Sequence, residues 1–131
     1  MPGETDLTVL LKSLRPLLRE GEFVFVTVSE GPEACAERHP IGIFHEDEGV
    51  TLILPREQAQ AAALPYSSVF RMITLSVHSS LDAVGFLAAI TAKLARHGIS
   101  VNPISAYYHD HLFVPAARAD EAMALLAELA G

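Results

Sequence analysis

The sequence predicts an α+β fold made of two successive β/α units, and three observations support this prediction. The chain has 131 residues, which is enough for one compact domain or for two small units. Runs of β-branched and aromatic residues alternate with helical leucine patterns along the chain. The order helix, strand, strand, proline-started helix occurs twice. We therefore expect an N-terminal unit over residues 1–66 and a C-terminal unit over residues 67–131.

The first predicted element is an amphipathic helix. Proline lacks an amide hydrogen, so we expect this helix to kink or restart at Pro16, and Gly21 to end it. Six leucines at spacings of three and four would share one face. They are Leu7, Leu10, Leu11, Leu14, Leu17 and Leu18.

The rest of the N-terminal unit contains three predicted strands and a helix. Residues 23–28 are continuously apolar or β-branched, which is typical of a strand buried on both faces. A loop rich in glycine, proline and charge follows. Residues 41–44 and 50–54 predict two strands around an acidic turn. Pro55 suits the first turn of a helix, which we expect to reach about Leu64.

The C-terminal unit opens with a predicted strand over residues 69–77, whose apolar residues alternate with others. Ser79 or Ser80 is expected to cap a helix that Gly98 closes. Two more strands, around a turn at residues 108–110, and a last helix complete the unit. These elements cover residues 99–107, 112–114 and 118–130.

The two halves align at two different offsets. A shift of 77 residues superimposes Leu10, Leu17 and Gly21 on residues of the C-terminal helix and its end, and a shift of 60 superimposes Pro55 on Pro115. The difference of 17 residues indicates an insertion in the first unit. About six strands are predicted, two fewer than two complete βαββαβ units contain. Either one unit is incomplete, or the units share a strand.

Charge and composition disfavour several classes of function. The net charge is −7 and the nine basic residues are scattered, so we expect neither nucleic acid nor an anionic membrane as a partner. No apolar run approaches the roughly 18 residues of a membrane span, and the start does not resemble a signal peptide, so we expect a cytoplasmic protein. Cys35 is the single cysteine. His109 and His111 allow a metal hypothesis, but a turn between them would point them apart, and we expect no metal, cofactor or catalytic site.

Residues 74–87 and 97–102 resemble the first strand, glycine-containing loop, first helix and second strand of the ACT domain. Together with residues 107–115, the chain resembles short, stand-alone bacterial proteins with two ACT domains in tandem. This resemblance implies ferredoxin-like (βαββαβ) units with antiparallel sheets and helices on one face, used to bind amino acids in metabolic regulation. The N-terminal unit departs from the pattern, because it has no strand before its first helix and no clear glycine loop.

A ligand site is therefore expected where a strand passes into a helix in the C-terminal unit. Free amides and the positive end of the helix dipole would bind a carboxylate there, Asp82 would pair with an ammonium group, and Gly85 would allow close approach. Without any ligand, Asp82 also suits the helix dipole, and the two serines suit helix capping. The candidate ligand-binding residues are Ser79, Ser80, Leu81, Asp82, Val84, Gly85, Val101 and Asn102.

The sequence thus predicts a regulatory ACT-domain protein that binds a small molecule, an amino acid by the resemblance, and catalyses no reaction. The alternative is an assembly module whose sheet pairs with another copy and binds no ligand. In both cases we expect a homodimer, because a chain this small with exposed sheet edges needs additional cover.

Overall fold

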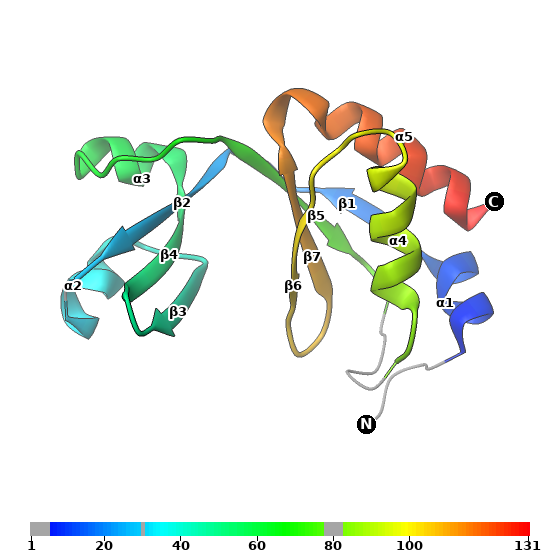
Figure 1. Cartoon of the computed structure of the whole chain (residues 1–131), viewed down its shortest axis with the longest axis horizontal. Coiled ribbons are helices and arrows are strands. Elements are labelled where there is room, and N and C mark those ends of the chain that lie inside the picture. The colour runs from blue at the N-terminus through cyan, green and yellow to red at the C-terminus, as the bar shows by residue number, and fades with distance from the viewer. Residues whose placement is uncertain (1–5, 30, 78–82) are drawn as a thin grey trace. The chain divides into compact units, whose positions relative to one another are not determined.

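The computed structural model describes residues 6–29, 31–77 and 83–131, and its contacts divide the chain into two compact units (Figure 1). Unit 1 is discontinuous and combines Met1–Glu20 with Arg71–Gly131. Unit 2 is the segment Gly21–Phe70 between them. The division of the sequence repeat after residue 66 stays a prediction. The compact units have different boundaries from this division, because the N-terminal segment packs with the C-terminal half.

Unit 1 contains a four-stranded sheet in the order β1-β5-β7-β6. Strand β1 pairs antiparallel with β5, and β6 pairs antiparallel with β7. The N-terminal segment therefore supplies the edge strand that completes the sheet of the C-terminal half. The elements of unit 1 are α1 (Leu7–Ser13), β1 (Pro16–Leu18), β5 (Phe70–Leu75), α4 (Phe86–Ala95), β6 (Asn102–Ser105), β7 (Asp110–Pro115), the 3-10 turn η1 (Ala116–Arg118) and α5 (Ala119–Ala130).

The predicted helix through Leu18 is wrong, because the N-terminal segment changes to a strand at Pro16. Helix α1 starts at the cap Asp6, whose carboxylate accepts a hydrogen bond from the amide of Val9, and its C-cap Leu14 is extended. A proline cannot continue a helix, but it fits an edge strand. Pro16 is the Cα partner of Leu75 in β5.

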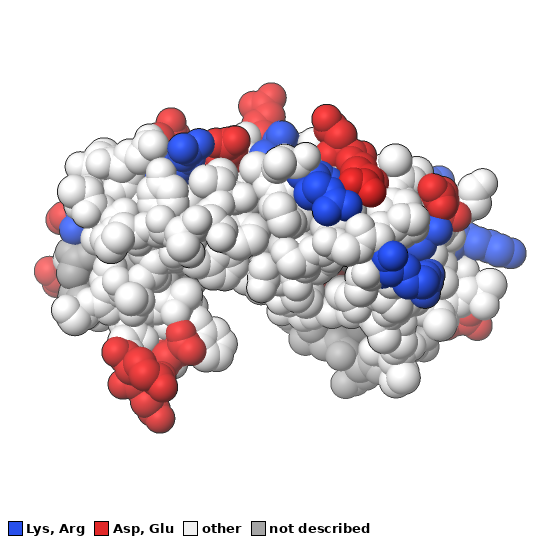
Figure 2. All heavy atoms as spheres, turned by 45° about the horizontal axis from the view of Figure 1, so that its top comes forward, with Lys and Arg blue, Asp and Glu red and all other residues white. Residues whose placement is uncertain are grey.

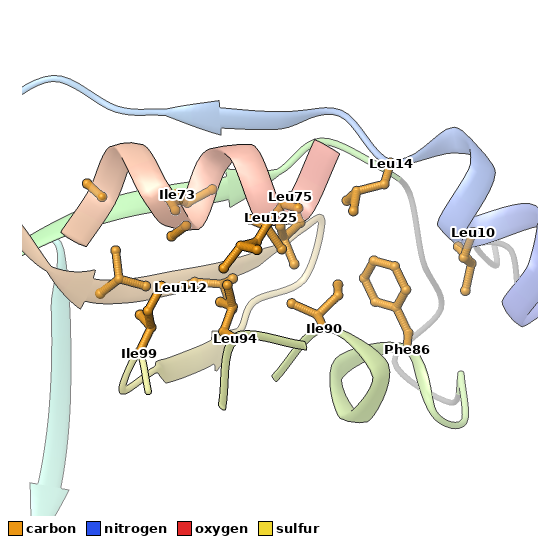
Figure 3. Close-up of a cluster of buried hydrophobic side chains, with 14 residues drawn as sticks. Leu10, Leu14, Ile73, Leu75, Phe86, Ile90, Leu94, Ile99, Leu112 and Leu125 are labelled. Carbon is orange, nitrogen blue, oxygen red and sulfur yellow. The ribbon is translucent and has the colours of Figure 1, made fainter. Parts of the chain in front are cut away.

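The core of unit 1 brings both ends of the chain together. Leu10 and Leu14 of the N-terminal segment are fully buried and belong to the same cluster as Phe86 and Ile90 of α4 (Figure 3). Leu125 joins this cluster from α5. Burying a leucine side chain contributes roughly 1.5 to 3 kcal/mol, so these contacts tie α1 firmly to the C-terminal half.

Unit 2 has the strand order β3-β4-β2, with antiparallel pairing at both junctions. The three strands are predicted well by the sequence. The region expected to be a plain loop contains a short helix, and Pro32 occupies its first turn, where no amide donor is needed. The elements are β2 (Phe23–Val28), α2 (Pro32–Glu37), β3 (Gly42–Glu46), β4 (Gly49–Pro55) and α3 (Arg56–Ala61).

The core of unit 2 lies on one face of this sheet. Alternate residues of β2 and β4 are buried together with Cys35 of α2 and Ala59 of α3. The buried residues of the strands are Val24, Val26, Val28, Leu52 and Leu54.

Strand β5 belongs to both units. Its first residue, Phe70, is the partner of Phe23 in unit 2, and Ile73 to Leu75 pair with β1 in unit 1. The two alternatives that the strand count left open, an incomplete unit or a shared strand, stay predictions for the division after residue 66. Both units combine antiparallel pairing with helices, which confirms the predicted α+β, ferredoxin-like class.

Candidate functional site

Glycine 85 makes a left-handed turn at the start of α4. Its φ is +85°, a conformation that side-chain-bearing residues adopt at a cost, and it is the N-cap of the helix. A Cβ atom at this position would meet the Leu7 side chain at 3.6 Å, an ordinary contact distance. The torsion angle, and not lack of space, is therefore the reason for glycine here.

The start of α4 differs from the prediction. The helix begins at Phe86, so the expectation that Ser79 or Ser80 is its N-cap is wrong. Ser79, Ser80, Leu81 and Asp82 lie outside the described residues. The reason for the later start is the left-handed turn, which interrupts helical geometry one residue before Phe86.

The first turn of α4 presents backbone donors. The first bond within the helix runs from the amide of Ala89 to the carbonyl of Gly85, at 2.9 Å. The amides of residues 86 to 88 precede it, and no side chain of the N-cap accepts from them. The first turn also contains no acidic residue. This end of α4 is chemically suited to an anion, although a helix terminus alone does not define a site.

The four candidate residues that the structure describes form two separate pairs. Val84 and Gly85 lie directly before α4, and Val84 is largely exposed. Val101 is half-buried against the core, and Asn102 is the exposed first residue of β6. A helix of ten residues lies between the pairs, and at about 1.5 Å per residue it is about 15 Å long. Along the chain, α4 and residues 96–100 separate the two pairs.

The β6–β7 hairpin lies beside the end of β5, which the sequence analysis did not include in the site. The Nδ1 atom of His111 is 3.0 Å from the hydroxyl of Thr74, and Nδ1 of His109 is 3.5 Å from the carbonyl of Val77. The tip presents two exposed tyrosines, Tyr107 and Tyr108, whose rings meet edge to face. The signal in the sequence was present, since aromatic and imidazole side chains crowd residues 107–111.

The histidine pair has a defined electrostatic environment. Burial lowers the pKa of His111 below its ordinary value, and the charges of His109 and Arg19 lower it further, while Asp110 acts in the opposite direction. Asp110 is the first residue of β7 and not the centre of a turn, so the predicted turn at residues 108–110 is wrong. Instead, the amide of Ala106 donates to the carbonyl of His109. Among the described residues, no three potential ligands are grouped for a metal ion.

The charged surface is mixed. Figure 2 shows basic side chains in separate places, several of them beside acidic ones. Three ion pairs have nitrogen–oxygen distances of 2.8 Å or less: Arg56 with Glu22, Lys93 with Glu128, and Arg118 with Glu121. None of the helices in the described parts of the chain combines the length and apolar character that crossing a membrane requires.

Similar folds occur in several solved structures. A Vibrio cholerae protein of unknown function, described as a possible transport protein, is 47% identical, with a TM-score of 0.89 over 95% of this chain and 96% of its own. An Agrobacterium tumefaciens protein is 16% identical, with a TM-score of 0.74 over 89% of each chain. The ligand-free regulatory subunit of aspartate kinase from Thermus thermophilus is 12% identical, with a TM-score of 0.66 over 89% of this chain and 96% of its own. The last two similarities show the fold alone.

The family follows from matches along the sequence. No curated protein matches the chain. An ACT-domain family model matches residues 2–71, which is more than half of the chain, and a second ACT-domain model matches residues 67–128. The chain therefore belongs to the ACT-domain family and carries two ACT domains in tandem.

Proposed function

We propose that this protein is a cytoplasmic regulatory module that binds a small molecule, an amino acid, and catalyses no reaction itself. The observation that carries the proposal is the left-handed turn at Gly85, which leads into a helix without a side-chain cap in a chain of the ACT family. A regulator needs a site that recognises both charges of an amino acid, and this junction offers chemistry for each of them.

The carboxylate of the ligand would bind the amides at the start of α4. These amides lie at the positive end of the helix dipole, and a charge-assisted hydrogen bond is about twice as strong as a neutral one. The ammonium group would pair with Asp82, and Ser79, Ser80, Leu81 and Val84 would line the same segment. Gly85 supports this role because its backbone offers close approach without a side chain.

Val101 and Asn102, at the start of β6, would complete the pocket for the same ligand. The variant Asn102→Ala decides between two forms of the site. Loss of affinity would include Asn102 in the site, and unchanged affinity would confine the site to residues 79–85.

The first experiment is a thermal-shift panel of amino acids. A ligand at 100 times its dissociation constant adds about 2.7 kcal/mol to the free energy of unfolding, so one or a few amino acids should raise the melting temperature. The active compound is then titrated calorimetrically. The variant Asp82→Asn should lose about 1.5 to 3 kcal/mol of binding energy, or roughly 10- to 150-fold in affinity.

Asp120→Asn is the matched control. Asp120 is an exposed aspartate in the first turn of α5, so its substitution makes the same chemical change far along the chain from the proposed site. We expect the control to bind as tightly as the parent. If Asp82→Asn and Asp120→Asn bind equally well, Asp82 is not part of the site and the main argument for amino-acid binding fails.

The second candidate function is an assembly module that dimerises without a ligand. The exposed apolar side chains of β3 favour it, since they suit contact with another protein chain. A panel in which no amino acid changes the melting temperature would support this function over the first. In either case we propose a homodimer, and light scattering that shows a monomer at high micromolar concentration would contradict it.

A further inference from the structure

Two histidines lie close together in unit 1, where β5 and β7 are neighbours in the sheet (Figure 1). His109 directly precedes β7, and His111 is the second residue of this strand. Their ring centres are 6.4 Å apart, and the ring planes meet at 85°. A turn centred on Asp110 would point these side chains apart. Because Asp110 is instead the first residue of the strand, residues on either side of it share one face.

Both imidazole rings are oriented by hydrogen bonds of their Nδ1 atoms. The Nδ1 atom of His111 is 3.0 Å from the hydroxyl of Thr74, and that of His109 is 3.5 Å from the carbonyl of Val77. A carbonyl only accepts, so Nδ1 of His109 carries the proton in its bond, and the Thr74 hydroxyl can accept in the same way. In a neutral imidazole with its proton on Nδ1, the Nε2 atom has a lone pair available for another partner.

This arrangement is typical of histidines that bind a metal ion. Such a histidine usually donates its second ring N–H to a protein oxygen, which fixes the tautomer and the ring orientation. The oxygen from Thr74 is well placed for this, because Thr74 is only 5% exposed and belongs to the sheet.

The spacing of the two rings is close to what one ion requires. Two imidazoles bound through Nε2 to one tetrahedral ion have ring centres about 5 Å apart, since the metal–nitrogen bonds are about 2.1 Å long. The observed 6.4 Å is about 1 Å more than this. The bond from His109 to Val77 is long, so the His109 ring can rotate toward His111 without losing a strong interaction.

We propose that the Nε2 atoms of His109 and His111 bind one divalent ion of the Ni²⁺, Cu²⁺ or Zn²⁺ class, with water in its remaining coordination positions. Imidazole suits these ions, whereas Mg²⁺ and Ca²⁺ prefer oxygen ligands. The described residues group no third histidine, cysteine or carboxylate around this pair. Two protein ligands hold an ion less firmly than the four of a structural zinc site, so binding is reversible and the fold does not depend on it.

The test is calorimetric titration of the full chain with Zn²⁺ at about pH 7.5, where an ordinary imidazole is neutral. We expect one ion per chain and no binding of Mg²⁺. The variants His109→Gln and His111→Gln should each weaken Zn²⁺ binding more than about tenfold, because even the loss of a residue that orients a ligand costs about 10- to 100-fold. His45→Gln is the matched control, since His45 is an exposed histidine of unit 2, and it should bind like the parent. Thermal unfolding without metal shows that the variants remain folded.

Thr74 allows a test of the orienting hydrogen bond. Thr74→Val keeps the shape of the side chain and removes the hydroxyl, so Zn²⁺ affinity should fall about 10- to 100-fold. Thr74→Ser restores a hydroxyl at the same place and should restore most of the affinity. Equal affinity of Thr74→Val and the parent would remove Thr74 as a positioning residue.

NMR of the histidine ring nitrogens identifies the coordinating atoms. Addition of Zn²⁺ should shift Nε2 of His109 and His111 and leave Nδ1 protonated. Undiminished affinity in His109→Gln or His111→Gln, an equal loss in His45→Gln, or coordination through Nδ1 overturns the site. The amino-acid titration is carried out with a metal chelator present, so that failure of the metal site and failure of the proposed function are seen separately.

Discussion

Leu14 and Leu17 allow a direct test of how the N-terminal segment is built. If residues 7–18 formed one amphipathic helix, both leucines would lie on its apolar face and both would be costly to remove. In the structure, Leu14 is 1% exposed within the core of unit 1, while Leu17 of β1 is 45% exposed. Leu14→Ala should therefore cost about 3 kcal/mol or more, the range found for buried leucines. Leu17→Ala should cost less than about 1 kcal/mol.

The assay is urea unfolding combined with hydrogen exchange read by mass spectrometry for each unit. The two units need not unfold together, so the exchange rates of residues 6–20 and 71–131 report the effect on unit 1 separately. We expect Leu14→Ala to accelerate exchange in both of these segments, because they share one core. Equal costs for the two substitutions, or an effect of Leu14→Ala confined to the N-terminal segment, would refute this account of unit 1.

Two other predictions concern the neighbourhood of the candidate site. Gly85→Ala should destabilise the protein by about 1 to 2 kcal/mol, because the φ of Gly85, +85°, is left-handed. Gly31 has a φ of −74°, so the control Gly31→Ala should change the melting temperature little. Equal melting temperatures of the two variants would contradict the torsional argument. His111 has a pKa below 6.5 in the folded state, so between that pKa and about 6.5 the unfolded chain binds more protons and stability rises with pH. His111→Gln should remove this part of the pH dependence, and an NMR titration of His111 with a midpoint above 6.5 would show the sign to be wrong.

The strands were the most predictable elements, since their patterns are local. Residues 23–28 form β2 with the predicted bounds, because a continuous run of β-branched and aromatic residues suits a buried central strand. The two proline junctions were also predictable. Pro55 and Pro115 each end a strand and precede a helical turn, with φ of −54° and −53°. A residue with fixed φ and no amide donor imposes the same local geometry in both units.

The N-terminal segment was not predictable from its leucine spacing. After Pro16 the same leucines satisfy strand alternation, with Leu17 outward and Leu18 toward the core, and two residues are too few to distinguish the two periods. The segment forms a strand because it pairs with an edge of β5, and β5 belongs to the C-terminal half. A contact between residues almost sixty positions apart cannot be inferred from a local pattern.

The start of α4 was misplaced for a related reason. Serines followed by an aspartate are typical of a helix start, and they outweighed Gly85 in the prediction. The left-handed turn places the first helical residue at Phe86, whose side chain is buried in the core. Tertiary packing therefore fixes the helix boundary, and the capping pattern does not. The part of the site that follows from sequence is the glycine, and the part that needs the structure is the position of the amides in the first turn of α4.

The corrected repeat also explains why a ligand site is expected in one unit only. By order along the chain, α2 of unit 2 corresponds to α4 of unit 1. The strand-to-strand connection that contains α4 covers residues 76–101, whereas the one that contains α2 covers residues 29–41. The longer connection therefore belongs to the C-terminal half. The predicted insertion in the first unit is therefore wrong. At the start of α2, the N-cap Gly31 is extended and Pro32 removes one amide donor, while α4 starts after a left-handed glycine with its donors intact. The physical argument for binding a carboxylate thus applies to the start of α4 and fails at its counterpart, which makes the two ACT domains of this chain chemically unequal.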